Sequence, residues 1–150
     1  MTEEENACKK KSLDLLSRRD HSSLELKRKL LDRGFSIALV DRTIKLLLNK
    51  KYLDDHRFAR EFFHFKYSAG QGPIKIKSEL RRKGIDKDLI DSLFNDLEYD
   101  WSRLAEKVLN KKFKNSAIDN INEYAKRLRY LESRGFEREQ VISVIGQPYE

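Results

Sequence analysis

The feature that constrains this chain most is a pattern that recurs three times along it. Each copy is centred on a glycine, at Gly34, Gly84 and Gly135, so successive copies are 50 and 51 residues apart. A leucine stands four residues before each glycine, a base directly precedes it and a large apolar residue directly follows it. These positions hold Leu30, Arg33 and Phe35, then Leu80, Lys83 and Ile85, then Leu131, Arg134 and Phe136. A spacing match of this length predicts a repeat protein.

Each position of the pattern fits the end of an α-helix. A glycine just after the helix adopts the left-handed backbone conformation that residues with a Cβ resist. The residue after that glycine then contacts the residue four before the glycine, and together they close a Schellman motif. The sequence therefore predicts positive φ at all three glycines and three apolar contacts: Phe35 with Leu30, Ile85 with Leu80, and Phe136 with Leu131.

Apolar residues recur at helical spacing through most of the chain, which predicts an all-α protein. Ser22 and Glu25 have the spacing of a capping box, and Pro73 suits the first position of a helix. We expect three tandem three-helix, helix-turn-helix-like repeats in an elongated, curved array. The helices are expected at about 12–19, 22–33 and 36–50, at 54–69, 73–83 and 86–97, and at 100–114, 117–134 and 137–146.

The expected organisation is a disordered tail at 1–11 and repeats at 12–53, 54–99 and 100–150. The tail is polar, with an acidic run followed by a basic one. Cys8 is the only cysteine, so we expect a free thiol and no intramolecular disulfide. No apolar run is long enough to span a bilayer and no signal-peptide core is present, so we expect a cytoplasmic protein without a membrane partner.

No group of residues has the spacing of a catalytic or metal centre. His56 and His64 are eight residues apart in one expected helix, too far to share a metal ion, and His21 falls in a connection. The adjacent acids Asp54 and Asp55 fit helix N-capping better than acid–base catalysis. We therefore expect no enzymatic activity, no cofactor and no metal ion.

The charge of the chain points instead to a polyanionic partner. Its 32 Lys and Arg outnumber its 25 Asp and Glu, for a net charge of +7. Bases gather on the second helices of the first two repeats and on the stretch 103–114, whereas the expected helix at 86–97 carries four aspartates. Either these are solvated faces without a partner, or they form a continuous basic strip along an anionic filament or nucleic-acid backbone, which we favour. The candidate binding residues are Lys27, Arg28, Arg57, Lys75, Lys77, Arg81, Arg82, Lys83, Lys111, Lys112 and Lys114.

Aromatic residues cluster in the expected helix at 54–69, and one helical face cannot hold all of them. We expect Phe58, Phe62 and Phe65 in the core, because they lie three and four residues apart. For Phe63 and Tyr67 we expect packing on a neighbouring repeat instead of a partner-binding patch.

Two segments have distinctive sequences: 18–22, which reads RRDHS, and 52–59, which reads YLDDHRFA. The first resembles the opening module of the RecX family, the bacterial regulators of the RecA recombinase, and the second resembles the most recognisable stretch of that family. The resemblance covers about residues 12–146 and is strongest from 17 to 85. In the third repeat only the helix-end pattern is clear. Further matching positions in the second module are Gly72, Ile76, Leu80, Gly84 and Ile85.

The resemblance implies an all-α repeat protein that binds RecA filaments on single-stranded DNA and inhibits their ATPase, strand exchange and co-protease activity. Some members of the family also bind DNA directly, and we expect a monomer. An alternative is a tandem helix-turn-helix transcription regulator, but four aspartates on the would-be recognition helix disfavour a major-groove fit. A third interpretation is a helical scaffold without any link to nucleic acid.

Overall fold

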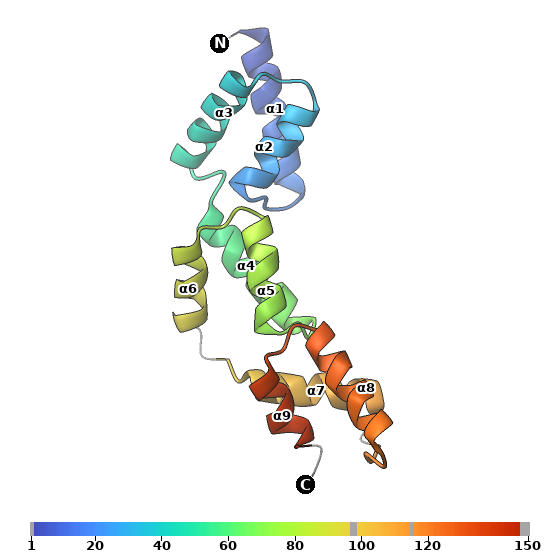
Figure 1. The fold of residues 1–150 in the computed structure, drawn as a ribbon. Coiled ribbons are helices and arrows are strands. Elements are labelled where there is room, and N and C mark those ends of the chain that lie inside the picture. Colours follow the sequence, from blue (N-terminus) through green and yellow to red (C-terminus); the bar gives the residue numbers. More distant parts are fainter. Residues whose placement is uncertain (1, 97–98, 115, 148–150) are drawn as a thin grey trace. The chain divides into compact units, whose positions relative to one another are not determined.

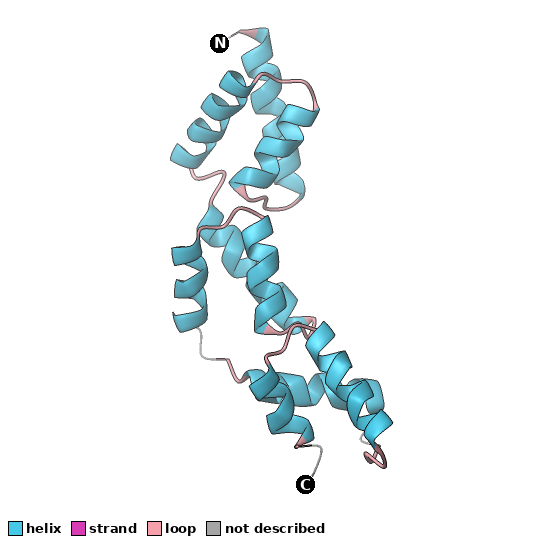
Figure 2. Cartoon of the chain, in the orientation of Figure 1, coloured by secondary structure: helices cyan, strands magenta, loops and turns pink. Residues whose placement is uncertain are grey.

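The computed structural model describes residues 2–96, 99–114 and 116–147, and in these residues it contains nine α-helices and no strand (Figures 1 and 2). This confirms the all-α fold class. The helices are α1 (Glu3–Arg18), α2 (Ser23–Asp32), α3 (Ile37–Asn49), α4 (Asp55–Ser68), α5 (Pro73–Arg82), α6 (Lys87–Asp96), α7 (Trp101–Phe113), α8 (Ile121–Ser133) and α9 (Arg138–Ile145).

The three helix ends predicted from the repeat are confirmed. Gly34, Gly84 and Gly135 have φ angles of 93°, 80° and 95°. The Ile85 N–H donates to the Leu80 carbonyl at 3.1 Å and the Phe136 N–H to the Leu131 carbonyl at 3.2 Å, the longer hydrogen bond of a Schellman motif. In the first copy, Phe35 packs against the buried cluster that contains Leu30. The glycine pattern therefore ends α2, α5 and α8.

The start of the chain differs from our prediction of a disordered tail at 1–11. Helix α1 begins at Glu3, and the Thr2 hydroxyl caps it by accepting from the Glu5 N–H. Cys8 is fully buried, and the Ser12 hydroxyl donates to its carbonyl at 2.8 Å. Acids in the first turn favour this helix through its dipole, and small side chains at Cys8 and Ser12 let it pack closely.

Helix α8 also differs from the sequence expectation, because it starts at Ile121 and not at 117. Asn120 caps it by accepting from the Glu123 N–H. The guanidinium of Arg127, itself buried, donates to the carbonyl and hydroxyl of Ser116. These bonds hold residue 116 in a conformation outside the helix, and a cation–π contact with the Phe113 ring at 4.5 Å completes the surroundings of Arg127.

The chain divides into two compact units. The first comprises residues 1–61 and 80–90, and the second comprises 62–79 and 91–150, so α4, α5 and α6 contribute to both. In the first unit, α1, α2 and α3 pack together around Leu26, Leu30, Val40 and Leu47. In the second, α7, α8 and α9 pack together, and their core holds Leu104, Ala105, Leu131, Phe136 and Val141.

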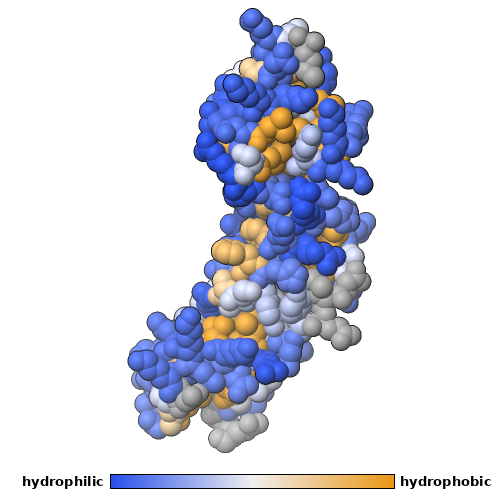
Figure 3. Space-filling view, turned by 180° about the vertical axis from the view of Figure 1, so that it is seen from behind, coloured by the Kyte–Doolittle hydropathy of each residue, from blue (hydrophilic) through white to orange (hydrophobic). Residues whose placement is uncertain are grey.

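Little of the drawn surface is apolar. On the face shown in Figure 3, most of the described surface is hydrophilic, and hydrophobic side chains form separate patches. None of the helices within the described residues combines the length and the apolar composition needed to cross a bilayer.

Candidate functional site

The eleven candidate bases divide between the two units. Whether they form one continuous strip stays a prediction, but the surroundings of each side chain are clear within its own unit. The first unit holds Lys27, Arg28, Arg57, Arg81, Arg82 and Lys83, and the second holds Lys75, Lys77, Lys111, Lys112 and Lys114.

Arg57 is part of the scaffold. Its Nε and Nη2 donate to the two carboxylate oxygens of Asp20 at 3.0 and 2.9 Å, and Nη2 also reaches the Tyr52 carbonyl at 3.3 Å. This guanidinium lowers the pKa of Asp20 below its ordinary value. A two-point pair between α4 and the connection before α2 positions helices. We therefore no longer count Arg57 among the residues available to a partner.

Lys83 is also paired, because it belongs to a cluster around the Glu25 carboxylate. Its Nζ donates to Glu25 Oε2 at 3.0 Å, and Arg19 donates to both Glu25 oxygens at 3.1 and 2.6 Å. Glu25 also completes the predicted capping box with Ser22. Burial alone would raise the pKa of Glu25, but the hydrogen bonds and charges of Arg19 and Lys83 lower it to about 2.

His21 is buried beside this cluster and serves as a hydrogen-bonding core residue. Its Nδ1 lies 3.0 Å from the Arg19 carbonyl and its Nε2 lies 2.8 Å from Lys29 Nζ. A carbonyl only accepts and a charged ammonium only donates, so Nδ1 carries the proton and the ring is neutral. Burial is the main cause that lowers the pKa of His21, and it also lowers that of Lys29.

The adjacent acids Asp54 and Asp55 cap two different helices. Asp54 accepts from the Arg57 N–H at 3.1 Å, at the start of its own helix α4. Asp55 accepts from the Ser23 N–H at 2.7 Å, at the start of α2. The capping role predicted for both acids is confirmed, and Asp55 exercises it 32 residues away in sequence. Segment 52–59 therefore contacts the connection before α2 and the start of that helix, and these contacts are structural.

In the second unit, a comparable junction uses the backbone. The Gly72 N–H donates to the Arg134 carbonyl at 2.7 Å and the Ile74 N–H donates to the Gly135 carbonyl at 2.9 Å. A Cβ at Gly72 would overlap the backbone of Gly135 and Phe136. The turn after α8 thus satisfies donors at the start of α5, which helix geometry leaves without partners.

The aromatic residues of α4 pack partly as predicted. Phe63 is fully buried, and its ring lies 4.8 Å from Phe94 of α6 and 5.9 Å from Trp101 of α7, while Tyr67 lies 5.3 Å from Trp101. Because Trp101 belongs to the expected third repeat, these contacts confirm that Phe63 and Tyr67 pack on a neighbouring repeat. Phe58 is buried as expected, but the prediction for Phe65 is wrong, because its side chain is 69% exposed.

The error at Phe65 has a simple geometric cause. The buried stripe of α4 runs through Ala59 and Phe63 and continues to the half-buried Tyr67, and these three residues are spaced four apart. Phe65 stands two residues beyond Phe63 and therefore points away from that stripe. The aromatic spacing alone allows two possible stripes, and burial follows the one that continues into the aromatic cluster.

The remaining candidates differ in how accessible their charges are. Lys27 pairs with Asp41 at 3.1 Å, Lys77 Nζ lies 4.7 Å from the centre of the Phe94 ring, and Lys112 Nζ lies 5.6 Å from that of Tyr130. Lys75 is half-buried. The candidates that are exposed and form no ion pair with another described residue are Arg28, Arg81, Arg82, Lys111, Lys112 and Lys114.

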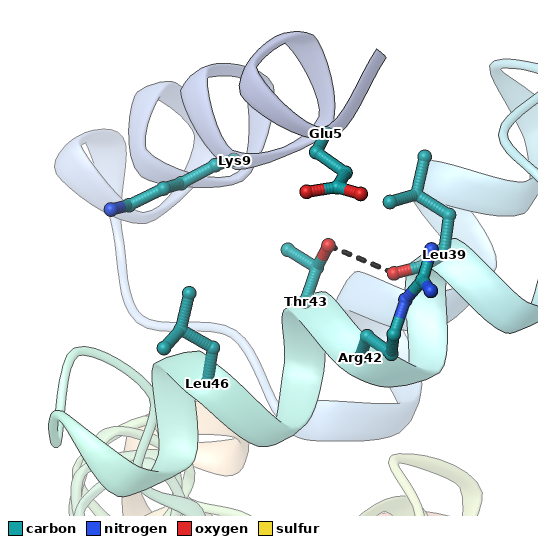
Figure 4. A pocket seen from close by; sticks show the side chains of 6 residues that line it. All are labelled: Glu5, Lys9, Leu39, Arg42, Thr43 and Leu46. Atoms are coloured by element: carbon teal, nitrogen blue, oxygen red, sulfur yellow. Dashed lines mark hydrogen bonds between the residues drawn. The ribbon is translucent and has the colours of Figure 1, made fainter. Parts of the chain in front are cut away.

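The described residues also form hollows that were not predicted from the sequence. In the first unit, a pocket lies between α1 and α3, and its lining residues are Glu5, Lys9, Leu39, Arg42, Thr43 and Leu46 (Figure 4). The Thr43 hydroxyl in this lining donates a hydrogen bond to the Leu39 carbonyl. In the second unit, a pocket of about 540 Å³ is lined by several bases, including Lys107 and Arg134, which are not among the predicted candidates. The base before the third glycine is the available sequence signal for Arg134.

Within the described residues, no three His, Cys, Asp or Glu side chains gather closely enough to hold a metal ion. The fold and these contacts define a protein of tandem three-helix domains, which are joined by ion pairs and by backbone hydrogen bonds. Family models for RecX match the chain in the corresponding order: the first three-helix domain at residues 8–47, the second at 54–92 and the third at 98–145. The chain belongs to the RecX family.

Individual relatives align with this chain over most of their length. The chain is 35% identical to Regulatory protein RecX of Vibrio vulnificus, covering 90% of this chain and 88% of the relative. It is 36% identical to that of Legionella pneumophila, covering 91% of each. The crystal structure of RecX from Lactobacillus salivarius aligns with a TM-score of 0.79 at 18% identity, over 97% of this chain and 96% of that one. Another RecX crystal structure aligns with the same TM-score at 23% identity, over 95% and 71%.

Proposed function

We propose that this protein is a negative regulator of the RecA recombinase. In this proposal it binds RecA filaments on single-stranded DNA in the cytoplasm and inhibits their ATPase, strand exchange and co-protease activity. The observation that supports it most is the match of all three domains, in order, to a family of regulatory proteins. The protein acts as a monomer and has no turnover of its own in this proposal.

The exposed, unpaired bases are the residues proposed to contact the filament. In the first unit they are Arg28, Arg81 and Arg82, and in the second they include Lys111 and Lys114. Their guanidinium and ammonium groups are free of carboxylates within the described residues, so a phosphate or acidic side chain meets no competing internal partner. Asp86, Asp88 and Asp91, by contrast, are exposed acids at the start and on the surface of α6, which argues against major-groove reading by that helix.

The test is an ATPase assay with purified RecA, ATP and single-stranded DNA. We expect the parent chain at stoichiometric amounts to lower the rate of ATP hydrolysis, and the Arg81→Gln/Arg82→Gln variant to inhibit less. That variant should also show a smaller slope of log affinity against log salt, because up to two charge contacts are lost. Its stability should change by no more than about 0.5 kcal/mol per site, because both side chains are exposed.

The matched control is Lys10→Gln/Lys45→Gln, which removes the same charge from exposed positions on α1 and α3. It should inhibit like the parent chain. Absence of inhibition by the parent chain, with filaments verified by electron microscopy, would remove the proposed function.

A further inference from the structure

The second unit contains a pocket whose lining carries positive charge and no carboxylate. It lies between the end of α4 and helices α7 and α8 and has a volume of about 540 Å³. None of its cations forms an ion pair with another described residue. Such a site concentrates positive charge that the protein itself does not neutralise. The four cations are Lys107, Lys111, Lys112 and Arg134.

The other walls of this pocket are apolar or aromatic. Leu104 and Val108 contribute aliphatic surface and Tyr130 contributes a ring. Arg134 is held in place at the rim, because one of its Nη atoms donates to the Ala69 carbonyl. Its Nε is buried and has no acceptor within the described residues. The pocket thus combines an apolar wall with a guanidinium fixed at its rim.

A second hollow adjoins the first and shares Lys112 and Tyr130 with it. It has a volume of about 570 Å³, and its other lining residues include Lys126 and Arg129, again with no carboxylate in the lining. Lys126 makes only a long contact of 3.8 Å with Glu123. The positive surface therefore continues past the Tyr130 ring. Sites that bind nucleotides typically combine cations, which bind the phosphates, with flat apolar or aromatic surface, on which the base stacks. An acidic peptide would require only the cations.

We propose that the pocket between α4, α7 and α8 binds a nucleotide. The base lies against Leu104 and Val108, next to the Tyr130 ring, and the phosphates are bound by the four cations. The nucleotide is either a free nucleoside triphosphate or one residue of a single strand whose next phosphates extend into the adjoining hollow. This inference goes beyond the proposed function, because the binding requires no recombinase.

The experiment titrates the full chain with two fluorescent probes in the absence of RecA. One probe is N-methylanthraniloyl-ATP and the other is a labelled oligothymidylate of about twelve nucleotides, within the usual site size for such binding. We expect at least one probe to saturate the protein. Saturation by the ATP probe assigns a free nucleotide as the ligand, and saturation by the oligonucleotide alone assigns a single strand.

The Lys107→Gln/Lys111→Gln variant should weaken binding by about ten-fold or more, because two phosphate contacts are lost. Ser68→Glu, which adds a carboxylate at an exposed lining position, should weaken it as well. The control Lys10→Gln/Lys45→Gln should bind within about two-fold of the parent chain, since its lysines line neither hollow. Circular dichroism confirms that each variant keeps its helices.

Two competitors test whether the base is bound. Tripolyphosphate should displace the ATP probe about ten-fold less well than ATP, and an abasic strand should displace the oligonucleotide similarly poorly, since base stacking contributes about this much. The proposal is overturned if neither probe binds, if both pocket variants bind like the parent chain, or if the base-free competitors or poly-glutamate compete equally well. The RecA assay can succeed or fail independently of each of these results.

Discussion

In each of the two units, helices of one repeat are joined to helices of the next, and the two junctions differ in their chemistry. In the first unit the junction consists of charged side chains, with Asp20 paired to Arg57 and Glu25 paired to Lys83. In the second unit it consists of backbone hydrogen bonds, in which N–H groups of Gly72 and Ile74 donate to the carbonyls of Arg134 and Gly135. The same glycine-centred turn takes part in both, and only its partners differ.

This difference teaches that one repeated local structure can support two kinds of sensitivity. Gly84 lies so close to α2 that a Cβ there would be 2.6 Å from the Leu24 Cβ, and a Cβ at Gly135 would be 2.4 Å from the Lys75 Cβ. Close approach is therefore common to both junctions. The ionic junction adds a dependence on charge and pH, whereas the backbone junction adds a dependence on the absence of a side chain at Gly72.

The largest effect is expected from Gly72→Ala. The added methyl would overlap the backbone of Gly135 and Phe136, which cannot move without breaking the junction. We expect a loss of about 3 kcal/mol or more in the free energy of unfolding, measured by urea titration. The matched control is Gly34→Ala, because no atom lies within 4 Å of the position that its methyl group would take. Its cost should be only the positive φ, about 1–2 kcal/mol. Equal losses in the two variants would show that the backbone junction does not depend on space.

A smaller loss is expected from Arg57→Gln in the ionic junction. The substitution leaves the Asp20 carboxylate without its two-point partner, which should cost about 1–2 kcal/mol. Lys27→Gln is the control, because its pair with Asp41 is largely exposed and should contribute no more than about 0.5 kcal/mol. A double-mutant cycle with Asp20→Asn measures the coupling directly. A coupling no larger than that of the Lys27–Asp41 pair would make Arg57 available again as a binding residue.

The last prediction concerns pH. Glu25 has a pKa of about 2 in the folded protein, below the value of about 4.3 for an unfolded chain. Its contribution to stability is therefore complete above the unfolded pKa and is lost as pH falls toward about 2. Asp20, whose pKa is also lowered, acts in the same direction. Unfolding titrations between pH 6 and 2.5 should show a shallower decline for Glu25→Gln than for the parent chain. Parallel declines would contradict the role of the Glu25 cluster.

The parts of this fold that sequence predicts well are those decided within a few residues. Gly34, Gly84 and Gly135 end helices because the cap requires left-handed backbone there, and Ser22 with Glu25 forms its box across three residues. The start of helix α1 is not predicted, because residues 3–11 lack the apolar periodicity that marks a packed helix, although their Glu, Ala and Lys residues favour helix formation. Burial of Cys8 depends on α3, which packs against α1.

The candidate site was less predictable, because it depends on pairing across long stretches of sequence. Arg57 and Asp20 are 37 residues apart, and Lys83 and Glu25 are 58 apart. No local pattern distinguishes such a paired base from a free one such as Arg81. Arg134 escapes prediction for the same reason, since the pocket that it lines is formed by three helices.

The capping of α2 by Asp55 has a consequence for how the protein is made and inherited. A ribosome that has released only the first three helices has not yet supplied Asp55, Arg57 or Lys83, on which those helices rely. The nascent first domain should therefore gain its full stability only after the second domain begins to emerge. Evolution can copy the sequence of one repeat, but a transplanted copy arrives without the acceptor and the charges that its neighbour provided. Exchange of repeats between relatives should succeed in pairs more often than singly.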